Sequence, residues 1–147
     1  GLIQSNRACS KNNSQVSPSF FGYGGGVFIP GNNINNEFIM RGGAIRDNNS
    51  ASGKGNGVAM DRIAAPPVQF SMEGPVAING DIHLQSCSTD DCVVNITGPL
   101  SVQSPLLITM DAPSGLSKRV LTGAFNAAQF TASPPQSLNA AGYIYTP

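Results

Sequence analysis

The most constraining feature of this sequence is a short pattern that returns at nearly constant spacing. Residues 37–48 read E-F-I-M-R-G-G-A-I-R-D-N, an apolar run that ends in two glycines and is followed by a second short run. The same order of residue types returns 32 positions later, pairing Phe38 with Phe70, Met40 with Met72 and Gly42 with Gly74. Repetition at such a period is typical of a coil whose successive turns stack on one another.

Two further correspondences extend the repeat in both directions. Gly26 and Gly57 lie 31 positions apart, and each precedes a short apolar run. A step of 24 positions continues the pattern, pairing Phe70 with Val94, Met72 with Ile96, Gly74 with Gly98 and Pro75 with Pro99. The shared core is apolar-x-apolar-x-Gly, which is the alternation of a strand closed by a corner residue.

The composition favours an all-β class. Charged residues make up 11% of the chain, against about 25% in a typical globular domain. Asn, Ser, Thr, Gln and Gly must therefore cover much of the surface, as in exported β-proteins with many turns. The 17 glycines and 11 prolines supply the turn positions.

The expected strands are short, with Gly or Asn at the corners. Such strands suit a β-solenoid better than a sandwich, although a sandwich with a coincidental repeat remains the alternative. We divide the chain into a polar lead-in at residues 1–21, with one short strand near Leu2, a solenoid at 22–123 and an irregular cap at 124–147. The cap ends in a short strand at 143–145, and further strands are expected at 81–84, 106–110 and 120–123. The terminal segments would act as caps or assembly arms.

Several pieces of the sequence, in their order along the chain, resemble the repeats of bacterial polymorphic outer-membrane proteins and related adhesins. These pieces are G-G-G-V-F-I, F-I-M-R-G-G-A-I-R-D-N, I-N-G-D-I-H-L, V-N-I-T-G-P-L and V-L-T-G, within residues 22–123. The resemblance implies a right-handed parallel β-helix from the terminal part of an array, with surface display or adhesion and no catalytic residues to transfer. Because few repeats are present, a longer parent array or self-assembly over open ends is expected.

The three cysteines favour a local disulfide. Cys87 and Cys92 enclose four residues, a spacing that a hairpin-like loop can bridge. Such a bond would imply an oxidising compartment and would leave Cys9 free or paired with another chain. Free thiols are the first alternative. A metal site is the second, with His83 and the Asp90-Asp91 pair as the nearby ligands.

No catalytic constellation stands out. The alternation at Ile82-His83-Leu84 places the sole histidine opposite its apolar neighbours, so we expect it to face solvent without a catalytic role. Glu73 follows Arg41 by one period of the repeat, which predicts stacked neighbours and an exposed ion pair. A lyase-like use of that pair is the alternative. We expect no cofactor and no metal.

The charge pattern also bears on partners. The eight basic residues form no stripe, so no nucleic-acid footprint is present. No apolar run is long enough to predict a transmembrane helix. The sequence opens without a charged start and an apolar core, so a signal peptide is absent or already removed.

The sequence therefore predicts a non-enzymatic, exported structural or adhesin-like β-solenoid. Its expected partners are further copies of itself, as a homo-oligomer or surface filament, or a neighbouring or host cell surface. A carbohydrate-binding or carbohydrate-cleaving β-helix is the alternative. Ile39 is the candidate interface residue, because it is apolar where the alternation predicts an outward side chain.

Overall fold

The fold is all-β and is dominated by parallel strands. The computed structural model describes residues 1–8, 24–31, 36–62, 68–85, 92–111, 118–133 and 136–145. Within these ranges the only helix is one 3-10 turn, η1, at Ala127–Gln129. The prediction of the all-β class is confirmed.

The first sheet has six strands, and all of its pairings are parallel. Its order is β1, β5, β8, β10 and β13, and β4 also pairs with β8. The strands are β1 (Leu2–Gln4), β4 (Glu37–Met40), β5 (Gly43–Arg46), β8 (Val68–Ile78), β10 (Cys92–Val102) and β13 (Leu121–Gly123). β1 matches the short strand expected near Leu2.

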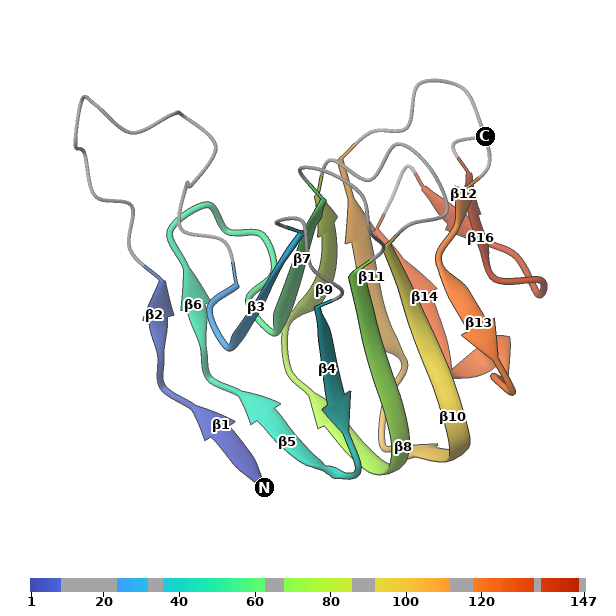
Figure 1. Cartoon of the computed structure of the whole chain (residues 1–147), viewed down its shortest axis with the longest axis horizontal. Helices are drawn as coiled ribbons and strands as arrows, with labels where there is room; N and C mark the ends of the chain where they lie inside the picture. Colours follow the sequence, from blue (N-terminus) through green and yellow to red (C-terminus); the bar gives the residue numbers. More distant parts are fainter. Residues whose placement is uncertain are drawn as a thin grey trace.

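The second sheet has five strands, again all parallel, in the order β14, β11, β9, β7 and β3. They are β3 (Val27–Gly31), β7 (Val58–Arg62), β9 (Asp81–Gln85), β11 (Leu106–Met110) and β14 (Phe130–Ala132). From β7 to β11 the chain alternates between the two sheets, so each pass adds one strand to each (Figure 1).

Two small sheets complete the fold. β2 (Arg7–Ala8) pairs in parallel with β6 (Asn49–Ser50) beside the first strands. β12 (Lys118–Arg119), β16 (Tyr143–Tyr145) and β15 (Ser137–Leu138) form an antiparallel sheet near the opposite end (Figure 1). The final strand at 143–145 is confirmed. The rest of 124–147 is less irregular than predicted, because β14 and β15 are too short to leave a periodic signal.

The strand register confirms the repeat spacing that the sequence predicted. Phe38 pairs with Phe70 and Met40 with Met72, as the longer step of the repeat requires. The shorter step continues the ladder, pairing Phe70 with Val94 and Met72 with Ile96. In the second sheet Val27 pairs with Val58, directly after the two matched glycines.

One predicted correspondence is wrong. Gly74 and Pro75 pair with Leu100 and Ser101, not with Gly98 and Pro99, because the register shifts between Ile96 and Leu100. Residues 97–99 of β10 therefore lie opposite the single residue Glu73 of β8. The Thr97 hydroxyl lies 3.3 Å from Glu73 Oε2, and a Cβ added at Gly98 would come within 2.9 Å of the same oxygen. This β-bulge therefore makes room for a side chain of the preceding turn.

The expected strand lengths also need correction. β8 and β10 each have 11 residues, because the strand continues through the corner glycine in β8 and through the bulge in β10. Gly74 has a φ of +77° in the middle of β8, whose first half pairs with β4 and whose second half pairs with β5. The corner between β4 and β5 also requires a glycine. Gly43 has a φ of +103°, and an added Cβ would lie 2.2 Å from the Gly1 carbonyl oxygen.

The core consists of rows of apolar side chains that follow the stacking direction. In the first sheet Phe38, Phe70 and Val94 form one row, and the two phenylalanine ring centroids are 5.6 Å apart. In the second sheet Met60, Leu84 and Met110 form a comparable row. Each fully buried side chain of this kind stabilises the fold by about 1.5–3 kcal/mol.

Phe70→Ala tests this packing. Phe70 is fully buried and has neighbours on both adjacent strands, so its truncation should lower the free energy of unfolding by about 3–5 kcal/mol in urea titrations. The matched control Phe28→Ala, at a side chain that is 36% exposed, should cost about 1 kcal/mol. Equal losses in both variants would contradict the proposed core.

Candidate functional site

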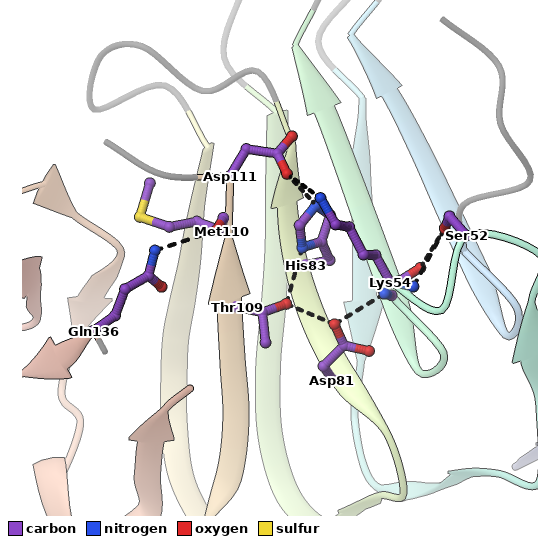
Figure 2. A network of polar contacts seen from close by, with 9 residues as sticks. Ser52, Lys54, Asp81, His83, Thr109, Met110, Asp111 and Gln136 are labelled. Carbon is purple, nitrogen blue, oxygen red and sulfur yellow. Dashed lines mark hydrogen bonds and ion pairs between the residues drawn. The ribbon is translucent and has the colours of Figure 1, made fainter. Parts of the chain in front are cut away.

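The outward face of the second sheet carries a buried cluster of polar side chains. Asp61 on β7 and Asp81, His83 and Gln85 on β9 alternate with the core residues, yet all four are buried. Lys54, Thr109 and Asp111 adjoin them (Figure 2). This group of seven residues is here called the polar cluster.

The Asp81 carboxylate holds the loop at residues 51–57 against the sheet. It accepts hydrogen bonds from the backbone N–H of Gly55 at 2.9 Å and of Asn56 at 2.8 Å. A third bond comes from the Thr109 hydroxyl at 2.6 Å. Three donors to one carboxylate fix its position, and charge-assisted bonds of this kind are stronger than neutral ones.

A hydrogen-bond chain orients His83. Its Nδ1 lies 2.9 Å from Thr109 Oγ1, and the Thr109 hydroxyl already gives its proton to Asp81. The Thr109 oxygen can therefore only accept, which places the proton of a neutral His83 ring on Nδ1. Nε2 then points towards Asp111 Oδ1 at 3.5 Å (Figure 2).

The prediction that His83 faces solvent is wrong, since its side chain is 2% exposed. The alternation itself is correct, because His83 lies on the face opposite Ile82 and Leu84. That face is covered, however. An ion pair between Lys54 Nζ and Asp111 Oδ1, at 2.6 Å, lies over the ring. His83 is thus enclosed by one residue that lies far before it in the chain and by another that lies far after it.

Burial shifts two pKa values in the cluster in opposite directions. Desolvation lowers the pKa of His83, although the nearby carboxylates of Asp111 and Asp81 oppose the shift. Desolvation raises the pKa of Asp61, and the negative charge of Asp111 adds to that rise. Among the described residues Asp61 Oδ1 has no hydrogen-bond partner. Burial therefore disfavours the charged form of each group relative to the unfolded chain.

A groove lies next to the polar cluster. It has a volume of about 760 Å³ and runs between the loop at 51–57, the corner after β8 and the turn before β11. Asp81 and Thr109 form the part of its wall that belongs to the cluster, and Asn56, Asn79, Gln103, Ser104 and Ser133 contribute further polar side chains. No aromatic residue lines it within the described part of the chain.

The geometry limits the chemistry that this region can carry out. Asp81 is occupied by three donors, and His83 is enclosed beneath the Lys54–Asp111 pair. Neither presents an accessible general base to the groove. The described residues contain no group of His, Cys, Asp or Glu suited to a metal ion. The cluster instead joins a loop to three strands.

The second candidate region is the exposed edge of β4. Among the described residues β4 pairs with β8 alone, so its other edge has no partner strand. Ile39 is 41% exposed on this strand, and Leu2 on the neighbouring β1 is 52% exposed. Together with Gly1, Phe38 and Gly42 they border a notch of about 290 Å³. Ile39 is thus accessible, and its role in an interface stays a prediction.

The remaining sequence predictions have mixed outcomes. Arg41 Nε and Glu73 Oε1 form the expected ion pair between stacked strands at 2.9 Å, and its exposure makes its contribution to stability small. Cys92 is buried at the start of β10, whereas Cys9, Cys87 and the Asp90-Asp91 pair lie outside the described residues. The Cys87–Cys92 disulfide stays a prediction.

Sequence reasoning singled out only His83 of the polar cluster and missed the other six residues, Lys54, Asp61, Asp81, Gln85, Thr109 and Asp111. Each is polar in an unremarkable local context, and no motif marks them. The register supplies the missing signal, because it places Thr109 beside His83 and Ala59 on the other side of it. An alignment of the two strand sequences D-I-H-L and L-I-T-M at this offset would have found the pair.

Comparison with models of protein families, with curated proteins and with solved structures found no match. In the described part of the chain, no helix has the length and apolar character needed to cross a membrane.

The lowered pKa of His83 predicts a pH dependence of stability. Between the ordinary pKa of about 6.5 and the lower folded value, the unfolded chain binds the proton that the folded chain resists. The free energy of unfolding should therefore fall as the pH drops below about 6.5 and level off below the folded pKa. Urea titrations from pH 8 to pH 5 measure this slope.

His83→Gln supplies the comparison, because it keeps a polar side chain near Thr109 and removes the titrating group. The part of the slope that belongs to His83 should vanish in this variant. Asp61 contributes with the opposite sign, since acidification favours its neutral form, and it is present in both proteins. An identical slope in the two proteins would contradict the assignment.

Proposed function

We propose that this chain is a non-enzymatic structural β-solenoid of an exported, adhesin-like surface protein, which self-associates through the exposed edge of β4. The regular alternation of strands between two parallel sheets supports the solenoid. Parallel crossover connections are right-handed in about 98% of cases, which favours a right-handed coil. The resemblance to adhesin repeats and the low charge content support the exported location.

The observation that carries the self-association is the contrast between the two ends of the stack. At the C-terminal end the antiparallel sheet of β12, β16 and β15 acts as a cap. Ile144 is fully buried, and the Gly142 carbonyl accepts hydrogen bonds from Val120 and Leu121. At the N-terminal end Ile39 and Leu2 are exposed. An open edge with apolar side chains favours the addition of another strand.

The neighbouring edge strand, β3, is protected in a way that β4 is not. Val27 N donates to Gly57 O, and bonded positions alternate along a parallel strand. Residues 28 and 30 therefore direct their backbone groups towards the outer edge of β3, where Pro30 has no N–H to offer. Residues 37–40 contain no proline. This difference makes β4 the preferred edge for association.

Ile39→Lys tests the proposal. A charge at this position should oppose burial against another chain and weaken self-association at least tenfold, as measured by light scattering over a concentration series. Phe28→Lys is the matched control, because Phe28 is similarly exposed but lies on the protected strand β3. We expect the control to associate as the parent chain does.

A parent chain that remains monomeric at high concentration would contradict the self-association. Equal weakening by both lysine substitutions would place the contact elsewhere on the surface or indicate a general effect of charge.

A second candidate function is binding of a neutral glycan, and the groove beside the polar cluster favours it. Its amide and hydroxyl side chains suit the hydroxyl groups of a sugar, whereas the aromatic platform common in such sites is missing from its described lining. Binding on a glycan array that Gln103→Ala abolishes would support this function, and an array without signal would remove it.

A further inference from the structure

Within the described residues, no strand pairs with the backbone groups that β4 directs away from β8 at alternate residues. Gln69 N donates to Asn36 O at 3.1 Å, which shows that Asn36 directs its backbone groups towards β8. Because bonded positions alternate along a parallel strand, Phe38 and Met40 also point towards β8. Glu37, Ile39 and Arg41 then point their N–H and C=O groups towards the open edge.

From this geometry we infer that two copies of this chain pair antiparallel along β4, about a two-fold axis at Ile39. The inference rests on the proposed self-association and specifies its mode. In this register Ile39 lies opposite Ile39 of the second copy, and Glu37 lies opposite Arg41. All three outward-pointing residues of each copy thereby meet outward-pointing residues of the other, so the free backbone groups are satisfied reciprocally.

Charge complementarity selects this register among the alternatives. The sequence E-F-I-M-R has an acid and a base at equal distances from Ile39, so a two-fold axis creates the Glu37–Arg41 pair twice. A shift of the pairing by one alternation would place Glu37 or Arg41 opposite Ile39 and lose both pairs. Arg41 uses Nε for Glu73, which leaves its two terminal nitrogens for a second carboxylate. Glu37 uses Oε1 to accept from the Ser71 hydroxyl, which leaves Oε2 for the second copy.

The side chains of β4 agree with the same arrangement. Phe38 and Met40 lie on the core side, where Phe38 is only half-buried although its neighbour Phe70 is fully buried. Antiparallel pairing places Phe38 of one copy against Met40 of the other and continues the apolar rows across the junction. On the outer face the two Ile39 side chains contact each other, which removes the exposed apolar surface.

The capped end argues against a continuous head-to-tail filament of single chains. A head-to-tail contact would require β4 to pair with the last strands of the stack, where β16 and the Gly142 carbonyl already hold β12 and β13. A two-fold contact uses the same open edge in both copies and closes the assembly.

Charge reversal tests the register. Glu37→Arg and Arg41→Glu should each weaken dimer formation at least tenfold in sedimentation equilibrium, because each places like charges opposite one another twice. Mixing the two single variants should restore association, since each variant then meets the opposite charge. The double variant E37R/R41E should likewise dimerise within about tenfold of the parent chain.

Arg46→Glu is the matched control for charge reversal. Arg46 is exposed on β5, contacts Gln4 and Asp47, and lies away from the open edge, so its reversal should leave the dimer unchanged. Circular dichroism of each variant verifies that the fold persists. The double variant keeps the test decisive if one single variant folds poorly.

The outcomes separate the register from the proposed function. Association that is unaffected by all reversals, or that the mixture fails to restore, overturns the β4 register and leaves self-association standing. A parent chain that shows no association at any concentration overturns both.

Discussion

The interaction on which this structure depends is the backbone hydrogen bond between parallel strands that lie one repeat of the sequence apart. Residues one period of the repeat apart pair in parallel, so few strands are satisfied by their immediate sequence neighbours. Each strand therefore depends on the strands one repeat before it and one repeat after it. The apolar rows follow from the same constraint, because in-register stacking places Phe38, Phe70 and Val94 above one another.

A stack held together in this way has two ends that the repeat itself cannot satisfy. In the described structure, the edge strands at the two ends differ in how their backbone groups are paired. The antiparallel sheet of β12, β16 and β15 adjoins β13 near the last described strands, and Pro30 removes a donor from the outer edge of β3. Among the described residues no strand pairs with the outer edge of β4, which also carries an exposed isoleucine. The proposed self-association follows from this imbalance, and the polar cluster serves mainly to fix the loop that crosses the second sheet.

Much of the fold could be predicted from the sequence, because equivalent residues on adjacent turns share their chemical type. The offsets of Phe38, Phe70 and Val94 gave the correct register, and the ion pair between Arg41 and Glu73 followed from it. The Gly98-Pro99 correspondence failed for a physical reason. A bulge that makes room for Glu73 shifts the ladder without changing the local sequence pattern.

The candidate site was harder to predict, because its members meet only through register and loop closure. Alternation correctly placed His83 on the outer face, but it carries no information about what covers that face. The cover comes from Lys54 and Asp111, in a loop and at a strand end far away in sequence. Ile39 was identified because it breaks the alternation, which is a local signal. Its exposure at an open edge depends on the absence of a pairing strand, which only the described fold shows.

Residue-resolved amide hydrogen exchange tests the central claim most directly. At low concentration the amides of Glu37, Ile39 and Arg41 should exchange rapidly, whereas those of Phe38 and Met40, bonded to β8, should be protected. At high concentration all five should be protected, because the second copy covers the open edge. Uniform protection of β4 in the dilute chain, or an alternating pattern that concentration does not change, would contradict the account.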